Sequence, residues 1–121
     1  MHALRRFHGD WGYIAIVLNF VAGVVAFAAW RRERFRGRWV WITTIVAEAA
    51  MMLQVLIGVI LVSSHKYTAP RFHMFYGFVA FITVGLAYSY RYQMRGRLEF
   101  FYMLVGFFLM GVGIRAILQV V

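Results

Sequence analysis

Histidines are the side chains of this chain best suited to bind a metal or a cofactor. His8 and His73 each stand four residues before a glycine, Gly12 and Gly77, beside an apolar stretch. On a helix, positions four apart lie on one face, one turn from each other. Haem ligation by two histidines in a helix bundle needs such an arrangement, because the imidazole reaches the iron and the glycine leaves room for the flat macrocycle. The pattern therefore predicts His8 and His73 as axial ligands of a haem, with Gly12 and Gly77 beside it.

Cations near these histidines in the sequence or in the expected bundle favour the same interpretation. Arg71 and Arg115 are placed to bind the carboxylates of such a cofactor. Arg115 has a second interpretation, in which its side chain extends to the membrane interface. The histidines have two further interpretations: a copper or zinc site formed by His65, His73 and Met74, and no cofactor at all, with the histidines as solvated helix ends.

Glu48 and Gln54 are the other polar side chains inside an apolar stretch that need an interpretation. A carboxyl group at that depth is expected to be protonated or paired, because burying a bare charge is costly. One interpretation is a neutral Glu48 that bonds Asn19 or Thr44 and holds helices together. A second is a proton-relay or quinone site that uses Glu48, Gln54 and Arg115.

Composition places the chain in the membrane. Hydrophobic residues make up 64% of its 121 residues and charged residues 14%, against about 25% charged in soluble proteins. A soluble domain of this size cannot hide so much apolar surface, so the surplus must face lipid. The chain has no cysteine, which excludes disulfides, thiolate ligands and covalent c-type haem.

Four apolar stretches predict the fold. They span residues 11–30, 40–64, 72–90 and 100–121, and each approaches the ~20 residues that a helix needs to cross the hydrocarbon core. They lack the alternation of a membrane barrel, so we expect helices. Short connections make neighbouring helices antiparallel. The predicted fold is an all-α membrane protein, a single transmembrane domain over residues 1–121 built as an antiparallel four-helix bundle.

Arginine predicts the orientation of the bundle. Eight arginines lie in the first and third connections, against four cations near the start of the chain and in the second connection. Because positive loops stay inside, we expect the arginine-rich loops in the cytoplasm, both termini on the outer side, and the chain in the cell membrane of a prokaryote. We attribute the net charge of +9 to loops that orient the chain in the membrane, and we expect no nucleic-acid partner.

The order of the polar positions resembles one half of the haem A synthase family. The stretch LQVLIG, with Gln54 and Gly58, precedes a loop and then HMFYGFVAFI, which begins at His73, while His8 starts the first helix. Each half of that family is a four-helix bundle that holds one haem between histidines of two helices. The resemblance covers about residues 5–90. It implies the same fold and the same pair of ligands here.

Two departures from the family limit what carries over. Members with synthase activity have a glutamate three residues before the first histidine, where this chain has Arg5. The chain also lacks a second half and the cysteine pair of the outer loop. We therefore expect a haem pocket without catalytic activity of its own.

The expected function is that of a small membrane b-type haem protein near the outer face. It transfers electrons or serves as a haem-stabilised subunit, with other membrane subunits of a respiratory or photosynthetic complex and the lipid bilayer as partners. The alternative is a cofactor-free accessory subunit of such a complex, since the chain is small and rich in apolar faces.

Overall fold

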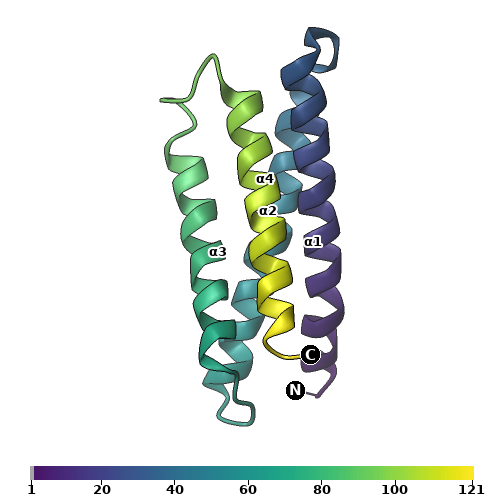
Figure 1. The fold of residues 1–121 in the computed structure, drawn as a ribbon. Coiled ribbons are helices and arrows are strands. Elements are labelled where there is room, and N and C mark those ends of the chain that lie inside the picture. The colour runs from purple at the N-terminus through teal and green to yellow at the C-terminus, as the bar shows by residue number, and fades with distance from the viewer. Residues whose placement is uncertain (1) are drawn as a thin grey trace.

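A computed structural model describes residues 2–121, and this part of the chain is all helical, with no strand (Figure 1). The long helices are α1 (His2–Arg31), α2 (Arg38–Ser63), α3 (Arg71–Ser89) and α4 (Leu98–Leu118), and a short 3-10 helix, η1, spans Glu33–Phe35. All four long helices are apolar and long enough to cross a membrane. The predicted all-α membrane fold is confirmed.

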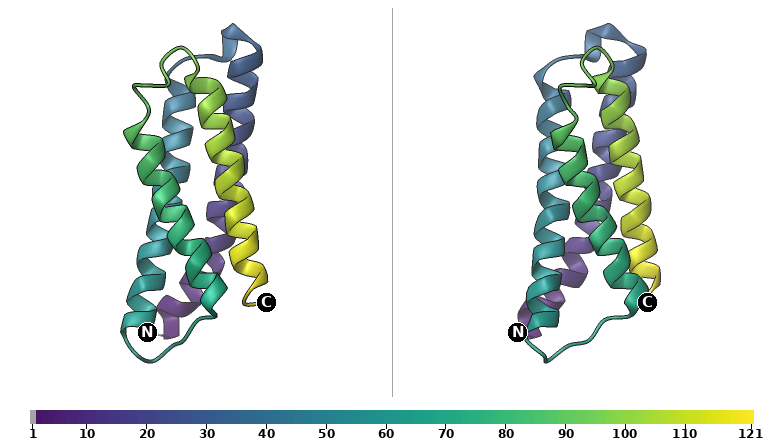
Figure 2. Two further views of the ribbon diagram at one scale, coloured as in Figure 1. Left: turned by 60° about the vertical axis from the view of Figure 1, so that its left-hand side comes forward. Right: turned by 90° about the vertical axis from the view of Figure 1, so that its left-hand side faces the viewer.

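The helices run alternately up and down, so the two ends of the bundle differ. Both termini and the connection between α2 and α3 lie at one end, which we call the histidine end (Figure 1). The connections around residues 32–37 and 90–97 lie at the other, which we call the arginine-rich end. Helix α1 packs between α2 and α4, and α3 completes the square opposite α1 (Figure 2). Contact between α2 and α3 is the sparsest of the four neighbouring pairs.

Helix α1 begins before its apolar stretch. We expected the helix from about Trp11, and it begins at His2. Phe7 stacks on Trp11, with ring centroids 5.4 Å apart, and the side chain of Gln54 in α2 bonds the carbonyl of His8. These contacts hold the polar first turns against the bundle, and they place His8 within a helix.

Small residues form the buried face of α1 and bring α4 into backbone contact with it. That face consists of Gly12, Ala15, Asn19, Ala22, Gly23, Ala26 and Ala29. A Cβ added to Gly106 of α4 would lie 2.9 Å from the Gly23 nitrogen and 3.0 Å from the Asn19 carbonyl oxygen. Close approach of this kind is the usual basis of helix association in membranes.

Polar side chains fix the position of α1 along α2. The Asn19 amide donates to the carbonyls of Ala15, at 2.9 Å, and Ala47, at 3.2 Å. The Trp11 indole N–H donates to the carbonyl of Ala50 at 2.9 Å. Because these donors are satisfied by backbone carbonyls, they cost little to bury and set one register between the two helices.

The outer surface of the bundle is apolar, as contact with lipid requires. Helix α3 is the most exposed of the four, with only Ala80 and Ala87 buried. Phe72, Phe75 and Phe78 are each more than half exposed. The surface of α3 therefore faces the bilayer or another protein.

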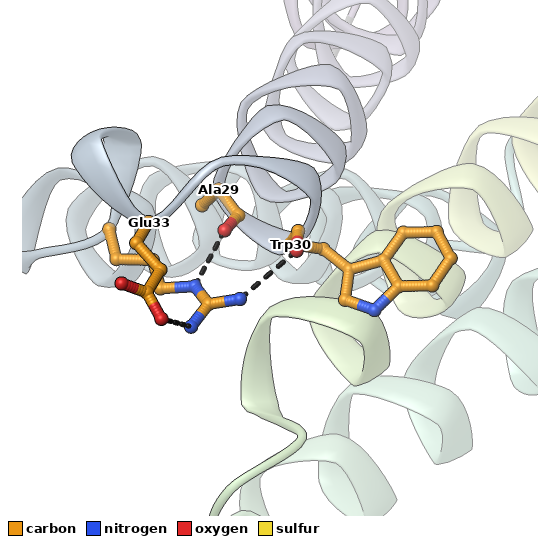
Figure 3. Close-up of polar contacts among 4 residues, drawn as sticks. Ala29, Trp30 and Glu33 are labelled. Carbon is orange, nitrogen blue, oxygen red and sulfur yellow. Dashed lines mark hydrogen bonds and ion pairs between the residues drawn. The ribbon is translucent and has the colours of Figure 1, made fainter.

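One arginine of the first connection closes the end of α1 (Figure 3). Arg36 donates from Nε to the Ala29 carbonyl at 2.7 Å and from Nη2 to the Trp30 carbonyl at 3.0 Å, and its Nη1 lies 3.8 Å from a Glu33 carboxylate oxygen. The last carbonyls of a helix have no partner within it, and a cation there also complements the helix dipole. From the charge pattern we expected Arg36 only to orient the bundle in the membrane. In the structure its side chain also caps α1.

The contact between α1 and α4 generates a prediction. Gly106→Ala places a methyl group against backbone atoms that cannot turn away, and overpacking of this kind costs about 1–3 kcal/mol. Gly111→Ala is the matched control, because a Cβ there meets no atom within 4 Å. We expect a lower unfolding midpoint for Gly106→Ala than for Gly111→Ala in detergent, followed by circular dichroism. Equal midpoints would contradict the tight packing described here.

Candidate functional site

Two of the four histidines meet inside the bundle at the histidine end. The ring centroids of His8, on α1, and His73, on α3, lie 6.3 Å apart, and the ring planes are nearly perpendicular at 81°. Both side chains are half-buried. Helices α1 and α3 stand diagonally across the bundle, so the two imidazoles span its interior rather than a contact between neighbouring helices.

The His8 side chain rests on a glycine of the helix between the two histidine helices. A Cβ added to Gly58 would lie 3.1 Å from His8 Cε1 and 3.6 Å from Nε2. Gln54, one turn away on α2, donates from Nε2 to the His8 carbonyl at 2.7 Å. Gln54 therefore holds the His8 backbone, and Gly58 makes room for its ring.

Two polar atoms at this contact lack a partner within the described part of the chain. They are Nδ1 of His8 and Oε1 of Gln54, and both are buried. A buried polar atom without a hydrogen bond costs about 1–3 kcal/mol. The His8 imidazole is therefore incompletely satisfied by the protein alone.

The His73 ring, in contrast, is oriented by a backbone carbonyl. Its Nδ1 lies 2.9 Å from the carbonyl oxygen of Ala116 in α4. A carbonyl only accepts, so Nδ1 carries the hydrogen, and in the neutral ring Nε2 has a free lone pair. Metal-binding histidines usually have one nitrogen held in this way while the other binds the metal.

The two glycines expected beside the cofactor have different surroundings. A Cβ on Gly12 would lie 2.9 Å from Nε2 of Gln54, so the space over this glycine is filled by the amide. A Cβ on Gly77 would meet no atom within 4 Å. Of the two, only Gly77 borders open space, because Gly12 lies in the tight contact between α1 and α2.

Arg115 and Arg71 lie at the same end of the bundle but differ in their contacts. Arg115 donates from Nη2 to the Tyr76 hydroxyl at 3.3 Å, and its guanidinium lies 5.7 Å from the centre of that ring. Tyr76 lies one turn after His73 in α3, and Arg115 is next to Ala116 in α4. The Arg115–Tyr76 contact and the His73–Ala116 bond therefore join the same segments of α3 and α4. Arg71 is exposed at the first residue of α3.

The remaining histidines are not part of this pair. His2 and His65 are exposed. His65, two residues after the end of α2, has a φ of 64°, a left-handed conformation typical of helix ends. Within residues 2–121, no three or more His, Cys, Asp and Glu side chains gather to hold a metal. The copper or zinc interpretation with His65, His73 and Met74 stays a prediction, because methionine is not among these side-chain types.

Glu48 lies farther along α2 and does not join the histidine pair. It is buried, and its Oε2 has no hydrogen-bond partner among the described residues, as is also true of Oγ1 of Thr44. Asn19 donates to backbone carbonyls instead. The expected bond from Glu48 to Asn19 or Thr44 is therefore not formed, and the Asn19 amide joins α1 to α2 instead.

Sequence reasoning found the two histidines but not what supports them. The resemblance named Gln54 and Gly58 as a motif, without assigning a contact to Gly58. Its partner proves to be the His8 imidazole. The Ala116 carbonyl is a backbone group, so no residue type signals it.

Comparison of the chain with models of known protein families, with curated proteins and with solved structures found no match.

Proposed function

We propose that this chain is a small integral membrane b-type haem protein with His8 and His73 as axial ligands. It transfers single electrons or serves as a haem-stabilised subunit of a larger membrane complex. The observation that carries the proposal is the imidazole pair, 6.3 Å apart between diagonal helices.

The separation of the two rings fits two ligands of one metal ion. A metal–imidazole bond is about 2.0–2.1 Å, so two nitrogens on opposite sides of a metal lie about 4 Å apart and their ring centres about 6 Å apart. The observed centroid distance of 6.3 Å agrees with this value.

The surroundings of the two histidines also suit a haem. His73 has its Nδ1 held by Ala116 and its Nε2 free, and His8 has a buried nitrogen without a protein partner. Gly77 leaves space one turn below His73. Arg115, and Arg71 at the start of α3, supply positive charge for carboxylates at this end.

When bound, a haem supplies one-electron redox chemistry, with a potential set by its axial ligands and the polarity of its pocket. The protein residues orient the ligands: Gln54 fixes the backbone of His8, Gly58 accommodates its ring, and the Ala116 carbonyl fixes His73. Two histidine ligands would leave no open coordination position at the iron for a substrate. We therefore propose no catalytic activity for the chain itself.

The proposal extends to a relationship with one half of haem A synthase. The order His8, then Gln54 with Gly58, then His73 carries the resemblance in the sequence. In the fold, Gln54 and Gly58 contact His8 and lie at the level of the histidine pair. This use of the LQ-x-x-x-G segment supports a common pocket.

We further propose that the arginine-rich end faces the cytoplasm of a prokaryotic cell and that both termini are outside. The eight arginines of the two connections at that end, against five cations at the opposite end, support this orientation. The partners would be other membrane subunits of a respiratory or photosynthetic complex.

A cofactor-free accessory subunit is the second candidate function. The exposed aromatic face of α3, with Phe72, Phe75 and Phe78, favours it. Such a face suits packing against another membrane subunit. An accessory subunit can carry haem or lack it, so the haem content of the purified chain distinguishes the two candidates.

Replacing either axial histidine tests the main proposal. We expect the wild-type protein purified in mild detergent to contain one haem b per chain by the pyridine haemochrome assay. His73→Ala and His8→Ala are expected to lose it while the helices remain, as measured by circular dichroism. His2→Ala and His65→Asn are the controls, asparagine being chosen because it tolerates the left-handed backbone. Colourless wild-type protein, or unchanged haem in His73→Ala, would refute the assignment.

Gly58 offers a test that leaves both ligands in place. Gly58→Val adds a branched side chain where even a Cβ lies 3.1 Å from the His8 ring. We expect lower haem content or a shifted reduced spectrum, because His8 must move. Gly111→Val is the control, since its surroundings are open. Identical spectra for the Gly58 and Gly111 variants would remove Gly58 from the pocket.

The absence of cysteine makes the orientation testable with single substitutions. Thr68→Cys and Gln93→Cys place exposed thiols at the histidine end and the arginine-rich end, respectively. In intact cells, a membrane-impermeant maleimide is expected to label Thr68→Cys, and Gln93→Cys only after permeabilisation. The reverse pattern would invert the proposed topology.

A further inference from the structure

A groove lies between α2 and α3, apart from the histidine pair. It has a volume of about 390 Å³, and its lining includes Glu48, Met52, Phe81, Gly85 and Tyr88. It forms because α2 and α3 meet only sparsely and because Gly85 presents no side chain to it, with no atom within 4 Å of an added Cβ.

The groove is a separate site from the candidate haem pocket. Glu48 precedes Gly58 by ten residues on α2, which is about 15 Å along the helix axis toward the arginine-rich end. Gly85 and Tyr88 lie on the corresponding part of α3. None of the residues that hold the two imidazoles lines the groove.

Glu48 gives this groove a specific polar group. The residue lines the groove but is only 7% exposed, and its Oε2, itself buried, has no hydrogen-bond partner among residues 2–121. A ligand in the groove therefore reaches this oxygen once the carboxyl turns toward it. In its protonated form a carboxyl donates one hydrogen bond and accepts others. No lysine or arginine lines the groove, so a phosphate or carboxylate ligand would find no countercharge there.

The walls indicate a ligand that comes from the membrane. Phe81, Gly85 and Tyr88 are all exposed on the outside of the bundle, where lipid lies, and the lining is mainly apolar. The volume falls in the range of about 300–1,000 Å³ that is usual for small-molecule sites. A suitable ligand is lipid-soluble and ring-sized, and it carries an oxygen that exchanges hydrogen bonds with a carboxyl.

We propose that this groove binds a quinone or quinol from the bilayer, with a ring oxygen bonded to Glu48 and the ring beside Phe81 and Met52. A quinone oxygen accepts from the protonated carboxyl, and a quinol hydroxyl donates to it. The proposal concerns binding and is independent of the haem assignment.

Decylubiquinone is the probe, and its binding to the purified full-length protein in nanodiscs is measured by titration calorimetry. We expect saturable binding. Gly85→Leu fills the groove and is expected to abolish it, whereas Gly111→Leu, the same change at a glycine of α4 with open surroundings, leaves it unchanged. Glu48→Leu removes the polar partner and is expected to weaken binding about tenfold, the equivalent of one hydrogen bond.

Two results would overturn the proposal. The first is equal binding to Gly85→Leu and to wild type, which places the quinone elsewhere. The second is equal displacement of the probe by decanol, which shows that the groove takes any apolar chain. Gly85→Leu decides the question even where Glu48→Leu fails to fold. Haem content, read from the visible spectrum of the same samples, reports separately on the histidine site.

Discussion

The close approach of α1 and α4 is the contact on which the rest of the bundle depends. Membrane helices gain little from burying apolar surface, because lipid is equally apolar, so association rests on close packing and on satisfied polar groups. Gly23 and Gly106 bring the two backbones together. A side chain at position 106 would meet the backbone of α1 and move α4 outward, and one at position 23 would meet the Phe107 ring. The position of the Ala116 carbonyl, and with it the orientation of His73, would then change as well.

Polar bonds between α1 and α2 fix the register of these two helices, as the glycines fix the distance between α1 and α4. Asn19, Trp11 and Gln54 each join a side chain to a backbone carbonyl of α1 or α2. A shift of one residue would break all three, and each broken bond would leave a buried group unpaired. Gln54 belongs both to this set and to the surroundings of His8. The same interaction thus fixes the helix pair and places the candidate ligand.

The sequence allowed the four helices and the meeting of His8 with His73 at one end to be predicted, because length, hydropathy and direction of the chain determine them. It did not show that Gly58, rather than Gly12, lies against the imidazole. Spacing along one helix identifies residues that share a face. It does not identify which residue of a neighbouring helix packs against that face. Arg36 was missed as a cap for a related reason, since its partners are carbonyls that every residue carries.

The bundle is uneven, and its loosest helix contributes to both proposed sites. Helix α3 buries only two alanines, and at the histidine end it is attached to α4 through His73 and Tyr76. Toward the arginine-rich end Gly85 leaves the groove beside α2 open. Tight packing there would have closed the groove beside Glu48. A buried carboxyl beside an open groove costs stability, and a fold selected for stability alone would have filled that space with a larger side chain at position 85. The open groove at Gly85 is therefore the part of the fold that the proposed quinone site would use.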